Sequence, residues 1–280
     1  MSWLITGVSK APLLLDSYSG AAAAYSLRQL SWAYGGPAVR VRRSSDNTEA
    51  DFTATQVSDG SLATWVGASN NGFVRTWYDQ SGNSRHVEQS TTANQPQIVS
   101  SGSLILKGTR PSLDFDGSND RLINSSISLS QPITHVIVSS RDNASGAADA
   151  YFDSLNPVQH VFYNAGTTET PNQNWTFNAG RASLFPSFTY STGTNLFLAS
   201  IYFSSASSNA RVNGAQRSTG DASTNGLSGL SVGDLRGNPT PIDPNYVLDG
   251  KISEYIIFPF NQSGNIAAIE ASINAHYAIY

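Results

Sequence analysis

The segment SLDFDGSNDRLI, residues 112–123, carries the clearest strand signal in this chain of 280 residues. Leu113 and Phe115 alternate with aspartates before a Gly-Ser-Asn turn, which is the period-two pattern of a half-buried strand. Similar runs, separated by turn residues, fill most of the chain: FVRTWYDQSGN (73–83), ITHVIVSS (133–140), HVFYN (160–164), NWTFNAG (174–180), NLFLASIYFSS (195–205), ARVNGAQRS (210–218), LSVGDL (230–235) and KISEYIIFPF (251–260). Short strands at this spacing, with no helices between them, predict an all-β sandwich or jelly roll and argue against a parallel α/β sheet.

Two segments near the ends of the chain are predicted to be helical. GAAAAYSLRQLSWAY, residues 20–34, combines a run of four alanines with apolar residues three to four positions apart, and Gly-Gly-Pro stops it. Near the C-terminus, Ser263 is the expected N-cap of a second helix. The expected buried face of that helix consists of Ile266, Ile269, Ile273 and Tyr277. The sequence therefore predicts a β-sandwich with a short N-terminal helix and a C-terminal helix.

Residues 1–19 are expected to form an apolar arm, because they combine short hydrophobic stretches with a proline and no strand alternation. Such an arm closes over the sandwich or docks on a neighbouring subunit, and the sequence leaves both alternatives open. Residues 20–280 contain no linker and no internal repeat. Because all-β sandwiches often reach roughly 200–250 residues undivided, we expect a single domain there.

Composition excludes several classes of protein. Charged residues make up 13% of the chain and the net charge is −4, with no stripe of Lys and Arg, so nucleic acid is not an expected partner. The chain has no cysteine, which excludes disulfides, thiolate metal sites and cysteine nucleophiles. No apolar run approaches the roughly 20 residues that span a bilayer, and the N-terminus lacks the basic start of a signal peptide. Synthesis in the cytoplasm, with no membrane span, is therefore expected.

The order of motifs in residues 110–280 resembles the laminin-G-like, concanavalin-A-like sandwich of lectins and glucanases. The segments that carry this resemblance are DFDGSND (114–120), RVNGAQR (211–217) and GKISEYIIF (250–258). The segments AAAAYSLRQLSWAYGGPAVRVRRSSDN (21–47) and WYDQSGNSRH (77–86) are similar to the start of the arabinofuranosidase-B type catalytic sandwich. They are equally similar to phage and bacterial proteins with the same opening. Both resemblances imply one concanavalin-A-like jelly-roll sandwich.

The acidic residues argue against an enzyme of this fold. Glycosidases need two carboxylates roughly 5–10 Å apart, and laminarinase-like sandwiches place them on a Glu-x-Asp-x-x-Glu strand. The glutamates of this chain form no such pattern: they are Glu49, Glu88, Glu169, Glu254 and Glu270. The resemblance to arabinofuranosidases implies a pocket floored by adjacent cysteines and a glutamate in an Asp-Leu-Glu-Asn-Gly type segment, and this sequence has neither. No catalytic residue is assigned, and a protein without enzymatic activity is expected.

Two motifs have the composition of a glycan site, in which aromatic rings cover the apolar face of a sugar and amides or carboxylates bind its hydroxyls. WYDQSGN supplies Trp77, Tyr78, Asp79, Gln80 and Asn83. NQNWTFN supplies Asn174 and Trp175. Successive side chains of a strand point to opposite faces, so Trp77 and Tyr78 cannot both face a ligand, and a structural role for the first motif is the favoured alternative. For Trp175 a core position and a glycan contact are both open.

No metal site and no cofactor are predicted. The four histidines are scattered without the spacing of a metal site: they are His86, His135, His160 and His276. DFDGSND contains three aspartates, which leaves a Ca²⁺ ion as an alternative. It lacks the Asp-x-Asp-x-Asp-Gly spacing, however, and an Asp-Gly-Ser-Asn turn explains its composition.

Composition and resemblance together favour a non-enzymatic virion surface protein, either a phage capsid decoration or a component of a head or tail fibre. Few lysines, no cysteine and an apolar arm suit a protein that stays folded on the surface of a particle. The expected partners are other virion proteins bound through residues 1–19, further copies of the chain in a homo-oligomer, and a cell-surface glycan. Two alternatives stay open: a glycoside hydrolase of the arabinofuranosidase type and a plain carbohydrate-binding module.

Overall fold

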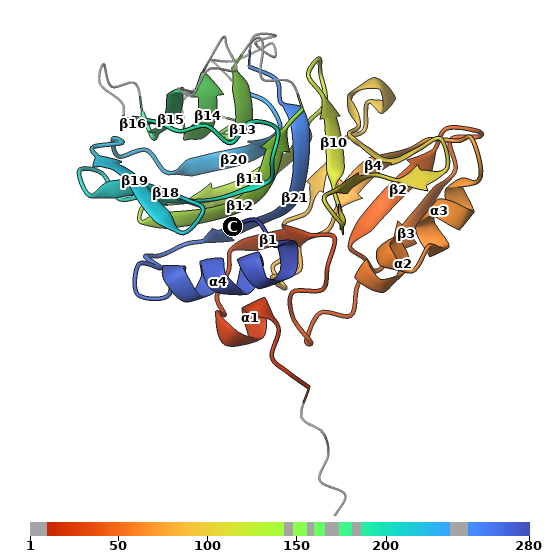
Figure 1. The fold of residues 1–280 in the computed structure, drawn as a ribbon, viewed down its shortest axis with the longest axis horizontal. Helices are drawn as coiled ribbons and strands as arrows, with labels where there is room; N and C mark the ends of the chain where they lie inside the picture. Colours follow the sequence, from red (N-terminus) through yellow and green to blue (C-terminus); the bar gives the residue numbers. More distant parts are fainter. Residues whose placement is uncertain (1–9, 143–147, 156–159, 166–173, 181–185, 236–245) are drawn as a thin grey trace, which may run out of the picture.

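The fold is dominated by antiparallel strands, with few helices, in a computed structural model of the chain (Figure 1). The structure describes residues 10–142, 148–155, 160–165, 174–180, 186–235 and 246–280. Strands make up most of the regular structure in these residues, so the prediction of an all-β protein is confirmed. None of the described helices is long and apolar enough to cross a membrane.

The helices are α1 (Leu14–Ser17), α2 (Ala54–Ser58), α3 (Ser61–Val66) and α4 (Ile266–Tyr277), with a 3-10 turn, η1 (Thr92–Asn94). The strands of the first half are β1 (Ala23–Ser26), β2 (Val39–Arg43), β3 (Glu49–Phe52), β4 (Gly72–Trp77), β5 (Val87–Glu88), β6 (Gln97–Ser100), β7 (Ser103–Leu104), β8 (Leu106–Lys107), β9 (Arg110–Pro111), β10 (Leu113–Asp116) and β11 (Leu122–Leu129). Those of the second half are β12 (Ile133–Arg141), β13 (Asp149–Asp153), β14 (Val161–Ala165), β15 (Asn174–Asn178), β16 (Ser187–Thr189), β17 (Phe197–Phe203), β18 (Ser208–Val212), β19 (Ala215–Gly220), β20 (Leu227–Val232) and β21 (Asp249–Phe258).

Nineteen of the described strands form one continuous sheet, while β8 and β9 pair only with each other. β21 pairs with β1 and β10 along one edge and with β12 along the other. From β12 the sheet continues through β17, β18 and β19, and we call β1, β21, β12, β17, β18 and β19 the first layer. From β10 it passes through β6, β4 and β5 to the second layer, which consists of β11, β20, β13, β14, β15 and β16.

Aromatic side chains fill the space between the two layers. The ring of Phe152 on β13 stacks against that of Tyr255 on β21, with centroids 5.3 Å apart. Phe177 on β15 meets Phe203 on β17 edge-on, with centroids 6.0 Å apart. All four side chains are fully buried. Burying one such side chain stabilises the fold by about 1.5–3 kcal/mol, so this interlayer core holds the two layers together.

Helix α4 covers the outer face of the first layer (Figure 1). Its buried apolar side chains are the four predicted from the sequence: Ile266, Ile269, Ile273 and Tyr277. The helix begins at Ile266 with Asn265 as its N-cap residue, so the prediction of Ser263 as N-cap is wrong. Ser263 lies instead in the turn before the helix, which the hydrogen bond from Asn265 N to Gln262 O closes at 2.9 Å.

The segment predicted to be the N-terminal helix contains a strand instead. Residues of β1 pair with β21 in register, from Ala23 opposite Ile257 to Ser26 opposite Glu254. Ala23 is buried in the interlayer core and Ala24 is buried on the α4 side, where larger side chains would not fit without repacking. Strand pairing overrides the helix propensity of alanine, which is an advantage of only about 0.7 kcal/mol per residue or less over most others.

The described part of the predicted arm includes helix α1. Leu14 and Leu15 are buried in the same apolar cluster as α4, and Leu15 N donates a hydrogen bond to Leu30 O at 2.8 Å. This part of the arm therefore packs on the chain's own fold. Residues 1–9 lie outside the described residues, so attachment to a neighbouring subunit and the boundary at residue 19 stay predictions.

Candidate active site

The WYDQSGN motif begins at the last residue of β4 and anchors β1 and the loop after it. Asp79 Oδ1 accepts a hydrogen bond from Ala24 N at 2.8 Å, and Gln80 Oε1 accepts one from Leu30 N at 2.9 Å. Asn83 Nδ2 donates to two backbone carbonyls just before β1. Asp79 and Gln80 are buried, and their polar atoms hold the backbone in place. These three residues serve the framework in this structure, and a glycan contact by them stays a prediction.

Trp77 and Trp175 lie in the core, on strands that are not neighbours. The ring of Trp77 is 5.8 Å from that of Tyr25. Trp175 stacks on Tyr151 at 5.7 Å, and its indole Nε1 donates to the carbonyl of Tyr190 at 2.7 Å. Neither tryptophan has any exposed surface. The structure therefore corrects the hypothesis that they contact a glycan, because neither ring offers a face to a ligand.

Besides Asn83, the predicted glycan residues with surface exposure are Tyr78 and Asn174. The Tyr78 hydroxyl donates to Asp51 Oδ1 at 2.8 Å, and its ring meets that of His86 edge-on at 4.8 Å. Burial and the hydrogen bond to Asp51 raise the pKa of Tyr78 to about 12. Asn174 is exposed at the start of β15, which pairs with β14 and β16 and not with β4. The two residues thus belong to separate regions, and a glycan contact by either stays a prediction.

The aspartates of DFDGSND build a turn and an ion pair. Asp116 Oδ1 accepts a hydrogen bond from Ser118 N at 2.9 Å, and Asp120 Oδ2 accepts one from Asp116 N at 3.1 Å. Asp114 pairs with Lys251 at 2.9 Å. Burial and the negative charge of Asp116 raise the pKa of Asp120 to about 7. Within the described ranges, no group of three or more His, Asp or Glu side chains is placed to hold a metal ion.

Glu254 is a framework residue on β21. Its carboxylate accepts two hydrogen bonds from the Arg28 guanidinium, at 2.7 and 2.9 Å. It also accepts hydrogen bonds from the hydroxyl of Ser26 at 2.9 Å and from that of Tyr277 at 3.2 Å. The carboxylate is buried, and its hydrogen bonds join β21 to β1 and α4.

Two buried aspartates at the ends of β13 and β20 form a site that the sequence analysis did not select. Asp153 is the last residue of β13, and the strand register places it opposite Ser231 of β20. Cross-strand partners have Cβ atoms about 4.5–5.5 Å apart. The Ser231 hydroxyl donates to Asp234 Oδ1. The two carboxylates therefore flank one serine, and we call Asp153, Ser231 and Asp234 the carboxylate site.

Each carboxylate of this site is held by donors. Asp153 Oδ1 accepts the backbone N–H groups of Ser154 at 2.7 Å and His160 at 3.1 Å. Asp234 Oδ2 lies 3.9 Å from Arg121 Nη1. Both aspartates have no exposed surface. Because burying a carboxylate is costly unless donors or cations surround it, these contacts are what keep the pair in place.

Gly233 brings Asp234 back toward Ser231. Its φ is +94°, a left-handed conformation that glycine adopts without steric cost. A Cβ atom at this position would lie 2.4 Å from Cε1 of Phe115. Its carbonyl accepts a hydrogen bond from Leu248 N at 2.9 Å, which fixes the turn against the strand that follows.

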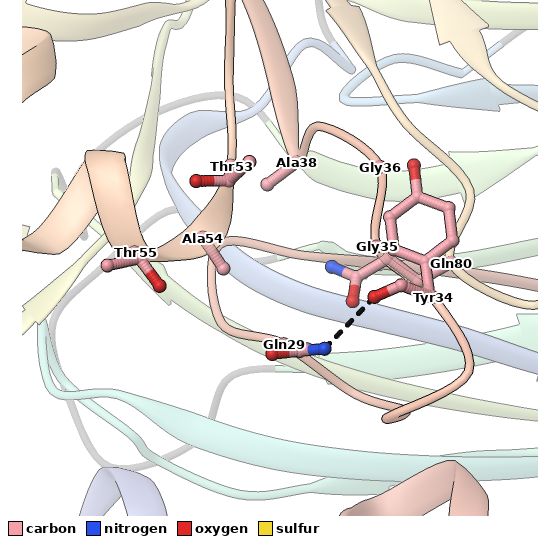
Figure 2. Close-up of a pocket in the computed structure, with 9 residues that line it drawn as sticks. All are labelled: Gln29, Tyr34, Gly35, Gly36, Ala38, Thr53, Ala54, Thr55 and Gln80. Atoms are coloured by element: carbon pink, nitrogen blue, oxygen red, sulfur yellow. Dashed lines mark hydrogen bonds between the residues drawn. The ribbon is translucent and has the colours of Figure 1, made fainter.

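A separate cavity of about 190 Å³ opens between α2 and the loop that follows β1 (Figure 2). Figure 2 shows the amide of Gln29 directed at the carbonyl of Tyr34, which accepts its hydrogen bond at 3.0 Å. Thr53 and Thr55 form the opposite wall, and Gln80 also contributes. Of the described residues that line this cavity, none carries a carboxylate, an imidazole or a cationic group. It therefore lacks the groups that acid–base chemistry requires.

Comparisons with known proteins reveal likeness in structure but none in sequence. No protein-family model matches the chain, and no curated protein matches it. A solved GH54 α-L-arabinofuranosidase, soaked with a cyclic sulfate inhibitor, superposes with a TM-score of 0.70 at 14% identity. An arabinofuranosidase complexed with arabinofuranosyl-α-1,2-xylobiose superposes with a TM-score of 0.68 at 14% identity. Both matches cover 94% of this chain and 64% of the other, so this chain spans less than two thirds of those proteins.

A more distant likeness links the chain to a Trypanosoma rangeli sialidase in complex with sialic acid. The TM-score is 0.51 at 8% identity, and the match covers 73% of this chain and 31% of the sialidase. The known proteins that share this fold thus include carbohydrate-active enzymes. The predicted resemblance to the arabinofuranosidase sandwich is confirmed at the level of the fold.

These matches contradict the expectation of a protein without enzymatic activity. The fold over 94% of the chain is shared with a solved α-L-arabinofuranosidase. The absence of cysteine argues only against a pocket floored by adjacent cysteines, and the scarcity of glutamate argues only against a Glu-x-Asp-x-x-Glu strand. Neither argument excludes a glycosidase, because aspartates can supply both of its carboxylates. The virion location, the virion partners and the homo-oligomer are tested by none of these observations and stay predictions.

Proposed function

We propose that this chain, which we infer to be a concanavalin-A-like jelly-roll sandwich, hydrolyses glycosides of α-L-arabinofuranosyl units. The observation that carries the proposal is the carboxylate site, where Asp153 and Asp234 flank Ser231 on neighbouring strands. Glycoside hydrolysis needs two such groups, one to protonate the leaving oxygen and one to attack the sugar or activate water. The likeness in fold to α-L-arabinofuranosidases supports the substrate class.

The contacts of the two aspartates suggest how the roles divide. Two backbone N–H groups donate to Asp153, and such donors favour the ionised carboxylate. We assign Asp153 as the group that attacks the anomeric carbon or takes a proton from the attacking water. Asp234 hydrogen-bonds to the Ser231 hydroxyl, which can accept as well as donate, so this contact also suits a protonated Asp234, whereas the backbone N–H groups at Asp153 can only donate. We assign Asp234 to give its proton to the glycosidic oxygen as the bond from that oxygen to the anomeric carbon breaks. Water supplies the new hydroxyl at the anomeric carbon, either by attacking it directly or by hydrolysing the glycosyl ester formed with Asp153, so the products are the free sugar and the released alcohol.

Hydrolysis of 4-nitrophenyl α-L-arabinofuranoside, followed by release of nitrophenolate, tests the proposal. We expect the wild-type chain to turn over this substrate, and Asp153→Asn or Asp234→Asn to lower kcat/KM about 100-fold or more, as for the loss of an acid–base group. Asparagine keeps the shape of each side chain, and circular dichroism checks that both variants are folded.

Asp59→Asn is the matched control, because Asp59 is an exposed aspartate that accepts the backbone N–H of Ser61 at the start of α3. This variant should keep wild-type turnover. Wild-type activity in either carboxylate-site variant, or no turnover of any arabinofuranoside or galactoside by the wild-type chain, would overturn the proposal.

A further inference from the structure

A polar cavity lies on the outer face of the first layer, where the cover provided by α4 ends. Two rows of cross-strand partners form its floor: Thr134, Tyr202 and Asn209 in one row, and Ser200, Arg211 and Gln216 in the next. The turn before α4 closes one side. We call this cavity, of about 120 Å³, the outer pocket. β17, β18 and β19, which carry most of these residues, lie beside the start of α4 in Figure 1.

Ser200 is the most informative side chain of the outer pocket. It is 2% exposed and lines the cavity, yet its Oγ has no hydrogen-bond partner among the described residues. A buried hydroxyl without a partner costs about 1–3 kcal/mol. A ligand group that hydrogen-bonds to Ser200 Oγ would recover that energy. We therefore expect a hydrogen bond to this atom to make a large contribution to the binding free energy.

The lining groups select a neutral ligand over an anion. Arg211 is the cation of the pocket, and the carboxylate of Glu270 already balances its charge through two hydrogen-bonded atoms, at 2.9 and 2.8 Å. Its Nη2 also donates to the carbonyl of Gly214 at 2.6 Å. The remaining polar groups are hydroxyls and amides, which both donate and accept hydrogen bonds. That mixture complements the hydroxyls of a sugar, each of which also donates and accepts.

The volume and lining of the outer pocket further limit which ligands it can bind. The volume of about 120 Å³ is well below the roughly 300–1,000 Å³ of sites for drug-sized ligands, so only one sugar ring can enter. Tyr202 is half-buried, so part of its ring remains available to the apolar face of such a sugar. Asn209 and Gln216 stand beside it on β18 and β19, where their amides can reach the ring hydroxyls.

We propose that the outer pocket binds one neutral glycosyl unit of a glycan chain, separately from the carboxylate site. Its floor residues come from β12, β17, β18 and β19, whereas the carboxylate site lies at the ends of β13 and β20 of the other layer. The inference rests on the pocket's own chemistry and does not require the chain to hydrolyse glycosides. It adds an accessory contact that holds a glycan on the protein surface.

A binding titration on the Asp234→Asn variant, which leaves added glycosides intact, tests this inference. The probes are methyl α-L-arabinofuranoside, xylobiose and sodium sulfate, and backbone amide chemical shifts report where each binds. We expect millimolar binding of at least one sugar, with the largest shifts in β17 and β18. Gln216→Ala should weaken it about fivefold, the effect of a hydrogen bond of about 1 kcal/mol. Ser200→Val, which fills the pocket and removes the hydroxyl, should abolish it.

Thr219→Ala is the matched control, because Thr219 is exposed on the same strand as Gln216 and does not line the pocket. It should bind like the parent, and all three substitutions in the wild-type background should leave turnover of small aryl glycosides unchanged. Sugar shifts confined to the carboxylate site, sulfate binding in place of sugar, or full binding by Gln216→Ala and Ser200→Val would each overturn the inference.

Discussion

His135 and His160 share a hydrogen bond in the core, between Nε2 atoms 3.0 Å apart. The neighbours of the pair fix where the protons lie. His160 Nδ1 faces the carbonyl of Asn225 at 3.2 Å and must donate to it, so His160 Nε2 accepts from His135 Nε2–H. His135 Nδ1 in turn accepts the hydroxyl of Tyr255 at 2.7 Å. Each ring carries one proton in this arrangement, and both rings are neutral at pH 7 because burial lowers the pKa of each.

Because of this histidine pair, we expect the folded protein to lose stability in acid. Burial lowers the pKa of His160 to about 4 and that of His135 well below its usual value. In the unfolded chain both titrate near 6.5, so between about pH 6.5 and 4 the unfolded state binds more protons and the free energy of unfolding falls as the pH falls. For His160 alone the loss reaches about 3 kcal/mol by pH 4. Urea unfolding from pH 7 to pH 4 measures it.

The variant His160→Asn separates the contribution of the histidine pair to the pH dependence of stability from the contributions of other titrating groups. Burial raises the pKa of Asp149 to about 6, which changes stability in the opposite direction over part of the same range. The difference between wild type and His160→Asn removes that shared contribution. The variant should be less stable at pH 7 but lose less stability on acidification. Parallel curves for the two proteins across this range would show that the pair is not the acid-sensitive group.

We also expect a large loss of stability when the single residue Gly233 is replaced by alanine. Gly233→Ala would combine a left-handed backbone with a Cβ atom 2.4 Å from Phe115. Gly60 has nearly the same φ, +91°, but open space around it, so Gly60→Ala isolates the cost of the backbone conformation. We expect about 1 kcal/mol for Gly60→Ala and about 2–4 kcal/mol for Gly233→Ala in urea unfolding. Equal losses in the two variants would contradict the close packing behind the carboxylate site.

At the scale of elements, α4 is predicted to stabilise the first layer through its apolar face. Ile273 is fully buried against that layer, so Ile273→Ala should lower the free energy of unfolding by about 2–5 kcal/mol. Ala271→Ser, on the exposed face of the same helix, should change it by less than about 0.5 kcal/mol. Thermal unfolding of the three proteins measures the difference. A small effect of Ile273→Ala would mean that α4 only lies on the sheet without stabilising it.

Elements were predictable from sequence where local pattern and tertiary context agree. Alternation between turns predicts β10, β12 and β17 to β21, and apolar spacing predicts α4. The pattern fails at β1, because its alanines favour a helix locally while β21 offers a complete set of strand partners. Helix α2 has a sequence signal that was not used, a capping box in which the side chains of Thr53 and Gln56 cap each other's backbone N–H groups.

The carboxylate site was not predictable in the same way. Asp153 and Asp234 are 81 positions apart, and only the register of β13 on β20 brings them together. The available signal was weak: an aspartate at or just after the end of each of two strand-like runs, DAYFD and LSVGD. The WYDQSGN motif was the stronger signal because it gathers aromatic and amide groups, but most of these groups face the chain's own backbone.

At the scale of the whole molecule, the carboxylate site and the outer pocket lie in different layers of one folded sheet. The carboxylate site belongs to β13 and β20 of the second layer, and the outer pocket belongs to β12, β17, β18 and β19 of the first. A glycan held at the outer pocket and cleaved at the carboxylate site would therefore have to extend across the edge between the layers. Short aryl glycosides need only the carboxylate site.

The central claim is that Asp153 and Asp234 hydrolyse an arabinofuranoside. The most direct test is the rate of nitrophenolate release from 4-nitrophenyl α-L-arabinofuranoside by the wild-type chain, Asp234→Asn and Asp59→Asn at matched concentrations. The account predicts turnover by the wild type and by Asp59→Asn, and a loss of about 100-fold or more in Asp234→Asn. Equal rates for all three proteins, or no release above the uncatalysed rate by the folded wild type, would contradict it.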